Sequence, residues 1–213
     1  MWQRLAHVLR ATGHDVFTPS LTGVGERAHL ASPAVDLSTH IADVMGAIQY
    51  ERLNELVLVG HSYGGMVVTG VADRLPERIR TLVYLDAFVP QPGQALVDLL
   101  RPEVRAHFQP GALQIAPLPP QAQGMRDPGE IAWLEGRRDA QPMKTFTQPL
   151  ALEGRYRGER AYVFCTGYSP TSFAPFAERA RNDPAWRYHE LPTHHYPQVS
   201  LPRETAGVLL NYA

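Results

Sequence analysis

Short apolar runs alternate with amphipathic segments along most of this chain. Apolar side chains at helical spacing predict helices over residues 2–12, 37–50, 63–75, 173–181 and 204–212. The first helix should end at Gly13, and Asp36 or Ser38 should cap the second. Short runs rich in β-branched and aromatic residues predict strands over 15–19, 56–59, 80–86, 161–166 and 186–191. This order predicts an α/β fold, with a mostly parallel sheet covered by helices on both faces.

Residues 90–156 interrupt the alternation. The segment is rich in proline, and its hydrophobic periodicity is broken. Because it is too long for a simple crossover between two strands, we expect a cap or lid inserted over the strand ends, where open α/β sheets bind ligands. The core would then comprise 1–89 and 157–213. Two short helices are expected within the cap, at 96–100 and 131–135. The alternative is a mobile surface excursion.

Size and composition fit one globular domain. The chain has 213 residues, of which 44% are hydrophobic and 19% are charged. A net charge of -1 without a cluster of basic residues argues against nucleic acid or an anionic membrane as a partner. The single cysteine, Cys165, excludes an intrachain disulfide and should be a buried core residue. No apolar run is long enough to cross a membrane, and residues 1–10 do not form a signal peptide, so a cytoplasmic location is expected.

One motif points to chemistry. Gly60-His61-Ser62-Tyr63-Gly64 matches the pattern G-x-S-x-G, and it lies between a predicted strand and a predicted helix. The glycines on either side should lack side chains so that strand and helix can approach each other closely. Ser62 would then stand exposed at a strained turn as a nucleophile, and the backbone N–H of Tyr63 would stabilise an oxyanion. The alternative is an ordinary turn that contains a serine.

A serine nucleophile requires a histidine base, which in turn requires a carboxylate. In this class of fold the chain order is serine, acid, histidine, so the base should follow the last strand, where His194 and His195 are both candidates. The acid is expected after the strand at 161–166, but residues 167–172 contain no carboxylate. Asp86, at the end of the neighbouring strand, keeps the chain order, although it could instead cap a turn. Asp183 is a weaker candidate.

Other readings of these side chains have less support. His189, His194 and His195 lack a fourth metal ligand at suitable spacing, so no metal site is expected. Gly23-Val24-Gly25 lacks the third glycine of a dinucleotide fingerprint and should be followed by a loop. The aromatic side chains should mostly belong to the core, with some lining an apolar pocket.

The chain resembles the α/β-hydrolase superfamily, and within it the small bacterial esterase-like proteins that are similar to plant hydroxynitrile lyases and methylesterases. The resemblance covers nearly the whole chain and rests on five segments: 13–29, 60–65, 82–90, 146–150 and 191–195. Relatives commonly carry Thr-Gly-His in the last segment, which implies that His195 is the base. Some members of the superfamily carry the acid after the strand that follows the elbow, and Asp86 matches that position.

The resemblance also implies a missing part. Relatives begin with further strands and a His-Gly loop that supplies a second oxyanion donor, so we expect this chain to be an N-terminally shortened version of a longer protein. Loss of one such donor typically costs about 10²–10³ in rate.

The expected function is hydrolysis of small carboxylic esters through an acyl-enzyme, with Ser62, His195 and Asp86 as the triad and without a cofactor. One alternative is a carbon–carbon lyase of the hydroxynitrile type, which would need a positive side chain such as Lys144, the single lysine. The other alternative is a catalytically impaired binding protein or a fragment. The sequence leaves the oligomeric state open.

Overall fold

A four-stranded parallel sheet forms the centre of the molecule in the computed structural model, which describes residues 1–109 and 111–213. The strands are β1 (Leu56–Ser62), β2 (Ile79–Ala87), β5 (Glu159–Cys165) and β6 (Trp186–Leu191), in the order β1-β2-β5-β6. Every pairing in this sheet is parallel. The predicted α/β fold with a parallel sheet is therefore confirmed.

The prediction of a strand at 15–19 is wrong, because these residues form no strand. Within the described residues β1 pairs with β2 alone, so β1 is an edge strand of the sheet. An extended segment becomes a strand only when a neighbouring backbone pairs with it, and Phe17 is 46% exposed rather than packed in the core.

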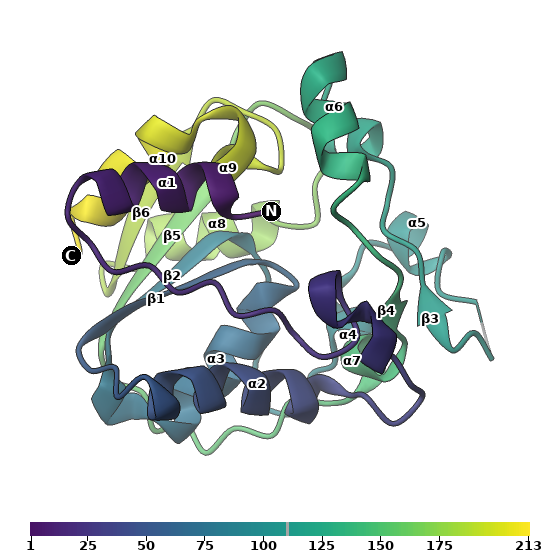
Figure 1. The fold of residues 1–213 in the computed structure, drawn as a ribbon, viewed down its shortest axis with the longest axis horizontal. Coiled ribbons are helices and arrows are strands. Elements are labelled where there is room, and N and C mark those ends of the chain that lie inside the picture. Colours follow the sequence, from purple (N-terminus) through teal and green to yellow (C-terminus); the bar gives the residue numbers. More distant parts are fainter. Residues whose placement is uncertain (110) are drawn as a thin grey trace.

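Helices cover both faces of the sheet, as expected (Figure 1). The face with α2 (Leu37–Tyr50), α3 (Gly64–Arg74) and α8 (Ala174–Asn182) forms the larger apolar cluster. The opposite face is covered by α1 (Gln3–Ala11) and α10 (Pro202–Leu210), with α9 (Pro197–Ser200) beside them. No helix among the described residues has the length and apolar character needed to cross a membrane.

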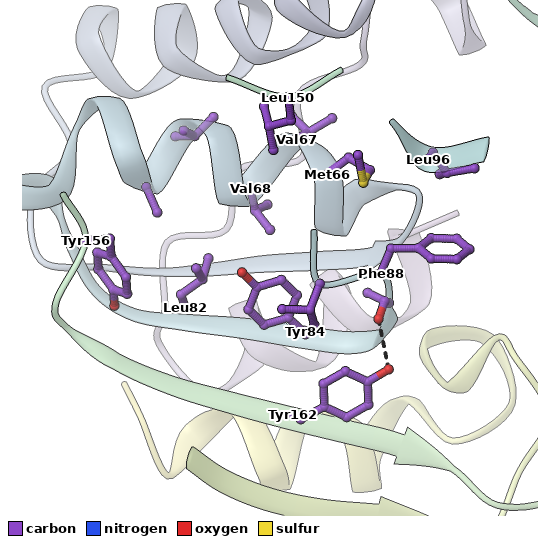
Figure 2. Close-up of a cluster of buried hydrophobic side chains, with 14 of the residues drawn as sticks. Met66, Val67, Val68, Leu82, Tyr84, Phe88, Leu96, Leu150, Tyr156 and Tyr162 are labelled. Atoms are coloured by element: carbon purple, nitrogen blue, oxygen red, sulfur yellow. Dashed lines mark hydrogen bonds between the residues drawn. The ribbon is translucent and has the colours of Figure 1, made fainter. Parts of the chain in front are cut away.

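The central strands alternate between these two clusters. Leu82 and Tyr84 of β2 pack into the cluster beside α3, whereas Val83 and Leu85 pack into the cluster beside α1 and α10. Figure 2 shows the first cluster, with Val68 of α3 directed toward the sheet. This period-2 alternation explains why the strands read as continuous apolar runs, because both of their faces are buried.

The helix ends follow the predicted signals. Asp36 caps α2, because its carboxylate accepts the backbone N–H of Thr39 at 2.9 Å in a capping box. Gly13, with φ +91°, follows α1 in the left-handed conformation that commonly ends a helix. The segment that follows Gly23 and Val24, where a loop is expected, contains a 3₁₀ helix, Gly25–Leu30. A second 3₁₀ helix, Pro76–Arg78, follows α3.

Residues 90–156 separate β2 from β5 and lie mainly to one side of the sheet (Figure 1). Their elements are α4 (Leu96–Leu99), α5 (Pro102–Arg105), β3 (Gln114–Ile115), the 3₁₀ helix Pro120–Gln123, α6 (Pro128–Glu135), β4 (Gln141–Pro142) and α7 (Lys144–Thr147). Both short helices predicted here are present, and α6 begins earlier than expected because Asp127 caps it. Met125 and Leu134 are fully buried in a cluster with Tyr196 and Val199, which anchors this segment to the core.

Candidate active site

Ser62 ends β1, and Tyr63 alone separates it from α3. Its backbone has φ +55°, in the left-handed region that non-glycine residues seldom adopt, whereas Tyr63 already has helical dihedral angles. Such a conformation costs about 1–3 kcal/mol and persists only where the surrounding structure enforces it. The strand, the strained serine and the helix thus follow one another as the G-x-S-x-G pattern predicts.

The close packing around this turn differs in part from the expectation. A Cβ on Gly60 would lie 2.5 Å from Cγ2 of Val68, so the strand and the helix do need a glycine there. Gly64, however, has no atom within 4 Å of such a Cβ, so the expected crowding at this position is wrong. The tight contact falls on the next residue, since a Cβ on Gly65 would lie 2.0 Å from the carbonyl oxygen of Phe88.

The side chain of Tyr63 holds the start of α3 against α2. Its hydroxyl donates to Nδ1 of His40 at 2.8 Å, and Nε2–H of the same imidazole donates to the carbonyl oxygen of Thr22 at 2.8 Å. His40 is fully buried, and burial lowers its pKa, so the ring is held neutral. This chain of contacts could not be predicted, because the three residues lie far apart in the sequence and come together only in the fold.

Asp86 lies beside the serine on the neighbouring strand. His61 pairs with Leu85 and Ser62 with Ala87, so Asp86 is the extra residue of an irregularity in β2 and has φ +43°. Its carboxylate is fully buried. The same end of the sheet therefore carries both the predicted nucleophile and the predicted acid.

His195, in the segment after β6, reaches this carboxylate. Its Nδ1–H donates to Oδ2 of Asp86 at 2.7 Å. The ring is 1% exposed and lies between Phe173, which stacks on it at 4.8 Å, and His61, at 4.4 Å between ring centroids. The buried Nε2 has no hydrogen-bond partner among the described residues. A neutral imidazole bound in this way presents Nε2 as an acceptor for a proton.

The residue that precedes Ser62 contacts the backbone of His195. His61, which directly precedes Ser62, donates from Nε2 to the carbonyl oxygen of His195 at 2.6 Å. The side-chain amide of Gln198 in turn donates to Nδ1 of His61 at 3.4 Å. Ser62 pairs in the sheet with the residue that follows Asp86, to which His195 is bound. The expected nucleophile and base therefore share one end of the molecule.

Burial sets the protonation of this group. It lowers the pKa of His195, and repulsion from the nearby side chains of His194 and Arg138 lowers that pKa further. It raises the pKa of Asp86, against which the hydrogen bonds from Tyr168 and the N–H of Cys165 act. With Asp86 ionised and His195 neutral, the pair holds a single buried negative charge, so it gains a proton readily as pH falls.

His194 and His195 have different hydrogen-bond partners. The Nε2 atom of His194 lies 3.0 Å from a carboxylate oxygen of Glu130 on α6, and its Nδ1 accepts the N–H of Tyr196, so His194 does not contact Asp86. Asp183 accepts the N–H of Ala185 in a turn.

The remaining candidate side chains lie outside this group. His189 contacts the hydroxyl of Tyr212, and no cluster of potential metal ligands occurs within residues 1–109 and 111–213. Cys165 is buried as expected, and burial raises the pKa of its thiol. Lys144 is exposed.

Sequence reasoning missed Tyr168, whose hydroxyl donates to Asp86 at 2.7 Å. Its position offered a signal, because it lies in the loop after β5 where the acid itself was sought. A cavity of about 280 Å³ borders this tyrosine and is lined by Gln121, Ala122, Gly124, Arg126, Gly167, Tyr168 and Ser169.

Comparison with known proteins agrees with this architecture. The model of the α/β-hydrolase family matches residues 1–208, so the chain belongs to that family. It is 43% identical to the carbendazim hydrolyzing esterase of Nocardioides sp., over 96% of this chain and 90% of that protein. It is 26% identical to the polyneuridine aldehyde esterase of Rauvolfia serpentina, over 99% of this chain and 89% of that protein. These relatives place the chain in an esterase-like branch and indicate carboxylic ester hydrolysis as its class of reaction.

Solved structures show the same fold. An extracellular α/β-hydrolase from a Paenibacillus species superposes with a TM-score of 0.85 at 23% identity and covers 100% of this chain and 93% of that one. The methylesterase MES16 from Arabidopsis superposes with a TM-score of 0.79 at 19% identity, over 99% of this chain and 91% of that one.

Proposed function

We propose that this protein hydrolyses small carboxylic esters through an acyl-enzyme on Ser62, with His195 as the base and Asp86 as the triad acid. The observation that carries this proposal is the 2.7 Å contact between His195 and Asp86, with Nε2 left unpartnered at the sheet end where the backbone of Ser62 is strained. Strain, burial and a positioned base in one place are typical of a functional site.

The mechanism follows from these positions. Oγ of Ser62 attacks the ester carbonyl while Nε2 of His195 accepts the hydroxyl proton, and Asp86 stabilises the imidazolium that forms. The N–H of Tyr63, at the start of α3, donates to the oxyanion of the tetrahedral intermediate. The imidazolium then protonates the leaving alcohol. Water, activated by His195, attacks the acyl-enzyme and releases the acid.

Residues 90–156 serve in this proposal as a cap over the strand ends. Two contacts support this role: Glu130 of α6 contacts His194, and the carbonyl oxygen of Gln123 accepts the N–H of His195 at 3.2 Å. The segment thus contacts the residues that hold the base. Such a cap would enclose the acyl or alcohol part of a small ester.

Replacement of Ser62 by alanine tests the proposal. Turnover of short p-nitrophenyl esters should fall by at least about 10³-fold, since the nucleophile is lost. Ser32→Ala, which alters an exposed serine, should leave turnover unchanged. Carbendazim should be tested as a substrate in the same assay, because the chain is 43% identical to a carbendazim hydrolyzing esterase. Unchanged turnover in the Ser62 variant would contradict the proposal, as would release of cyanide from mandelonitrile without any ester cleavage.

A further inference from the structure

The carboxylate of Asp86 is held by more than the imidazole. Oδ2 accepts two hydrogen bonds at 2.7 Å, one from Nδ1–H of His195 and one from the hydroxyl of Tyr168, while Oδ1 accepts the N–H of Cys165 at 3.2 Å. The hydroxyl oxygen of Tyr168 is also 3.3 Å from Nδ1 of His195. Tyr168 therefore stands at the junction between the acid and the base.

The direction of this hydrogen bond is fixed by the residues behind it. The N–H of Phe173 donates to the hydroxyl oxygen of Thr171 at 3.1 Å, and that hydroxyl donates to the oxygen of Tyr168 at 3.0 Å. An ionised carboxylate only accepts, so the single proton of Tyr168 is directed to Asp86. Burial raises the pKa of Tyr168, and the negative charge of Asp86 raises it further, so the phenol keeps this proton.

The cap contacts Tyr168 on the side away from the triad. A Cβ on Gly124, which follows the 3₁₀ helix of the cap, would lie 2.4 Å from Cβ of Tyr168. The ring is thus confined between the cap and the triad, with its hydroxyl pointing to the carboxylate.

We propose that Tyr168 is a positioning residue of the triad, which holds Asp86 from the loop where the chain order of the fold would place the acid itself. This inference rests on the proposed function. Asp86 reaches His195 from β2 on a strained backbone, and one of its oxygens is already bound by Cys165. The tyrosine supplies the second neutral donor, which keeps Oδ2 aligned with Nδ1 of His195 and stabilises its negative charge.

Tyr168→Phe tests this role, because it keeps the ring and removes the donor. We expect kcat for a p-nitrophenyl ester to fall by about tenfold with little change in KM, since one hydrogen bond to a charged group is lost. The acid limb of the profile of kcat/KM against pH should also move to higher pH. The less stabilised carboxylate binds a proton more readily, and it also holds the imidazolium more tightly. A tyrosine with a purely structural role would not move this limb.

Tyr188→Phe is the matched control, since Tyr188 also donates to a carboxylate, that of Glu190 at 2.8 Å, away from the site. It should change neither kcat nor the acid limb. Thr171→Val provides a second variant that leaves Tyr168 in place, and it should shift the limb in the same direction by a smaller amount. Thermal melts check that each variant is folded.

Labelling with a fluorophosphonate separates the two possible failures. If the unmodified protein labels on Ser62 but both Tyr168→Phe and Thr171→Val keep its kcat and acid limb, the positioning role is wrong and the proposed function stands. If the unmodified protein neither labels nor turns over esters, the proposed function fails and this inference fails with it.

Discussion

Backbone strain at single residues gathers at the proposed site. Four non-glycine residues among those described have positive φ, and two of them are Ser62 and Asp86, at the ends of adjacent strands. Sequence motifs indicated both residues, because a glycine-flanked serine and a carboxylate at a strand end are visible in the chain. The contacts that support them, from His40 to Tyr63 and from Tyr168 to Asp86, join residues distant in sequence. No hydrophobic periodicity in the sequence indicates such contacts.

The pH dependence of the reaction is also determined by single residues. The base acts when His195 is neutral and Asp86 is ionised, and burial raises the pKa of Asp86 to about 7. The pair therefore gains its proton as pH falls through this region, and the rate falls with it because the base is then blocked. We expect kcat/KM to have an acid limb near pH 7. A rate that stays constant down to pH 5 would contradict this account.

At the scale of elements, the turn from β1 to α3 determines where the nucleophile stands. The sequence located most helices and the four strands of the main sheet, since apolar periodicity reports which faces are buried. It failed at 15–19, because a strand also needs a partner, and pairing is not encoded in the segment itself. It also placed the tight packing on Gly64 rather than on Gly65, since the motif does not reveal which backbone lies opposite.

Paired substitutions test this packing. Gly65→Ala should destabilise the protein by at least about 3 kcal/mol, because its methyl group meets the carbonyl oxygen of Phe88. Gly64→Ala should be neutral or slightly stabilising, since the space is open and alanine favours a helix. Urea unfolding followed by circular dichroism measures both. Equal destabilisation by the two changes would show that the contact at Gly65 does not control this turn.

At the scale of the whole molecule, one sheet with helices on both faces brings distant segments together at its carboxyl edge. The contact between Asp86 and His195 follows the expected chain order, in which the acid precedes the histidine. The burial that assembles the site also has a consequence for stability. His61 is enclosed by its contacts with His195 and Gln198, and burial lowers its pKa to about 3.

Stability should therefore respond to pH through His61. Between pH 4 and 6 the unfolded chain protonates this histidine while the folded protein does not, so this residue makes the free energy of unfolding fall as pH falls. His61→Gln should change the slope of that free energy against pH by about 1.4 kcal/mol per pH unit in this range. Above pH 7.5 the slopes of the two proteins should coincide. Identical slopes between pH 4 and 6 would contradict the burial of a neutral His61.

The central claim is that Ser62 is activated by His195 in the folded protein. Reaction with a fluorophosphonate, followed by peptide mapping, measures this most directly, because it requires the nucleophile, the base and the fold together. The account predicts one adduct, on Ser62, that is lost in Ser62→Ala and strongly slowed in His195→Ala. A protein that melts cooperatively but does not label, or that labels on another residue, would contradict it.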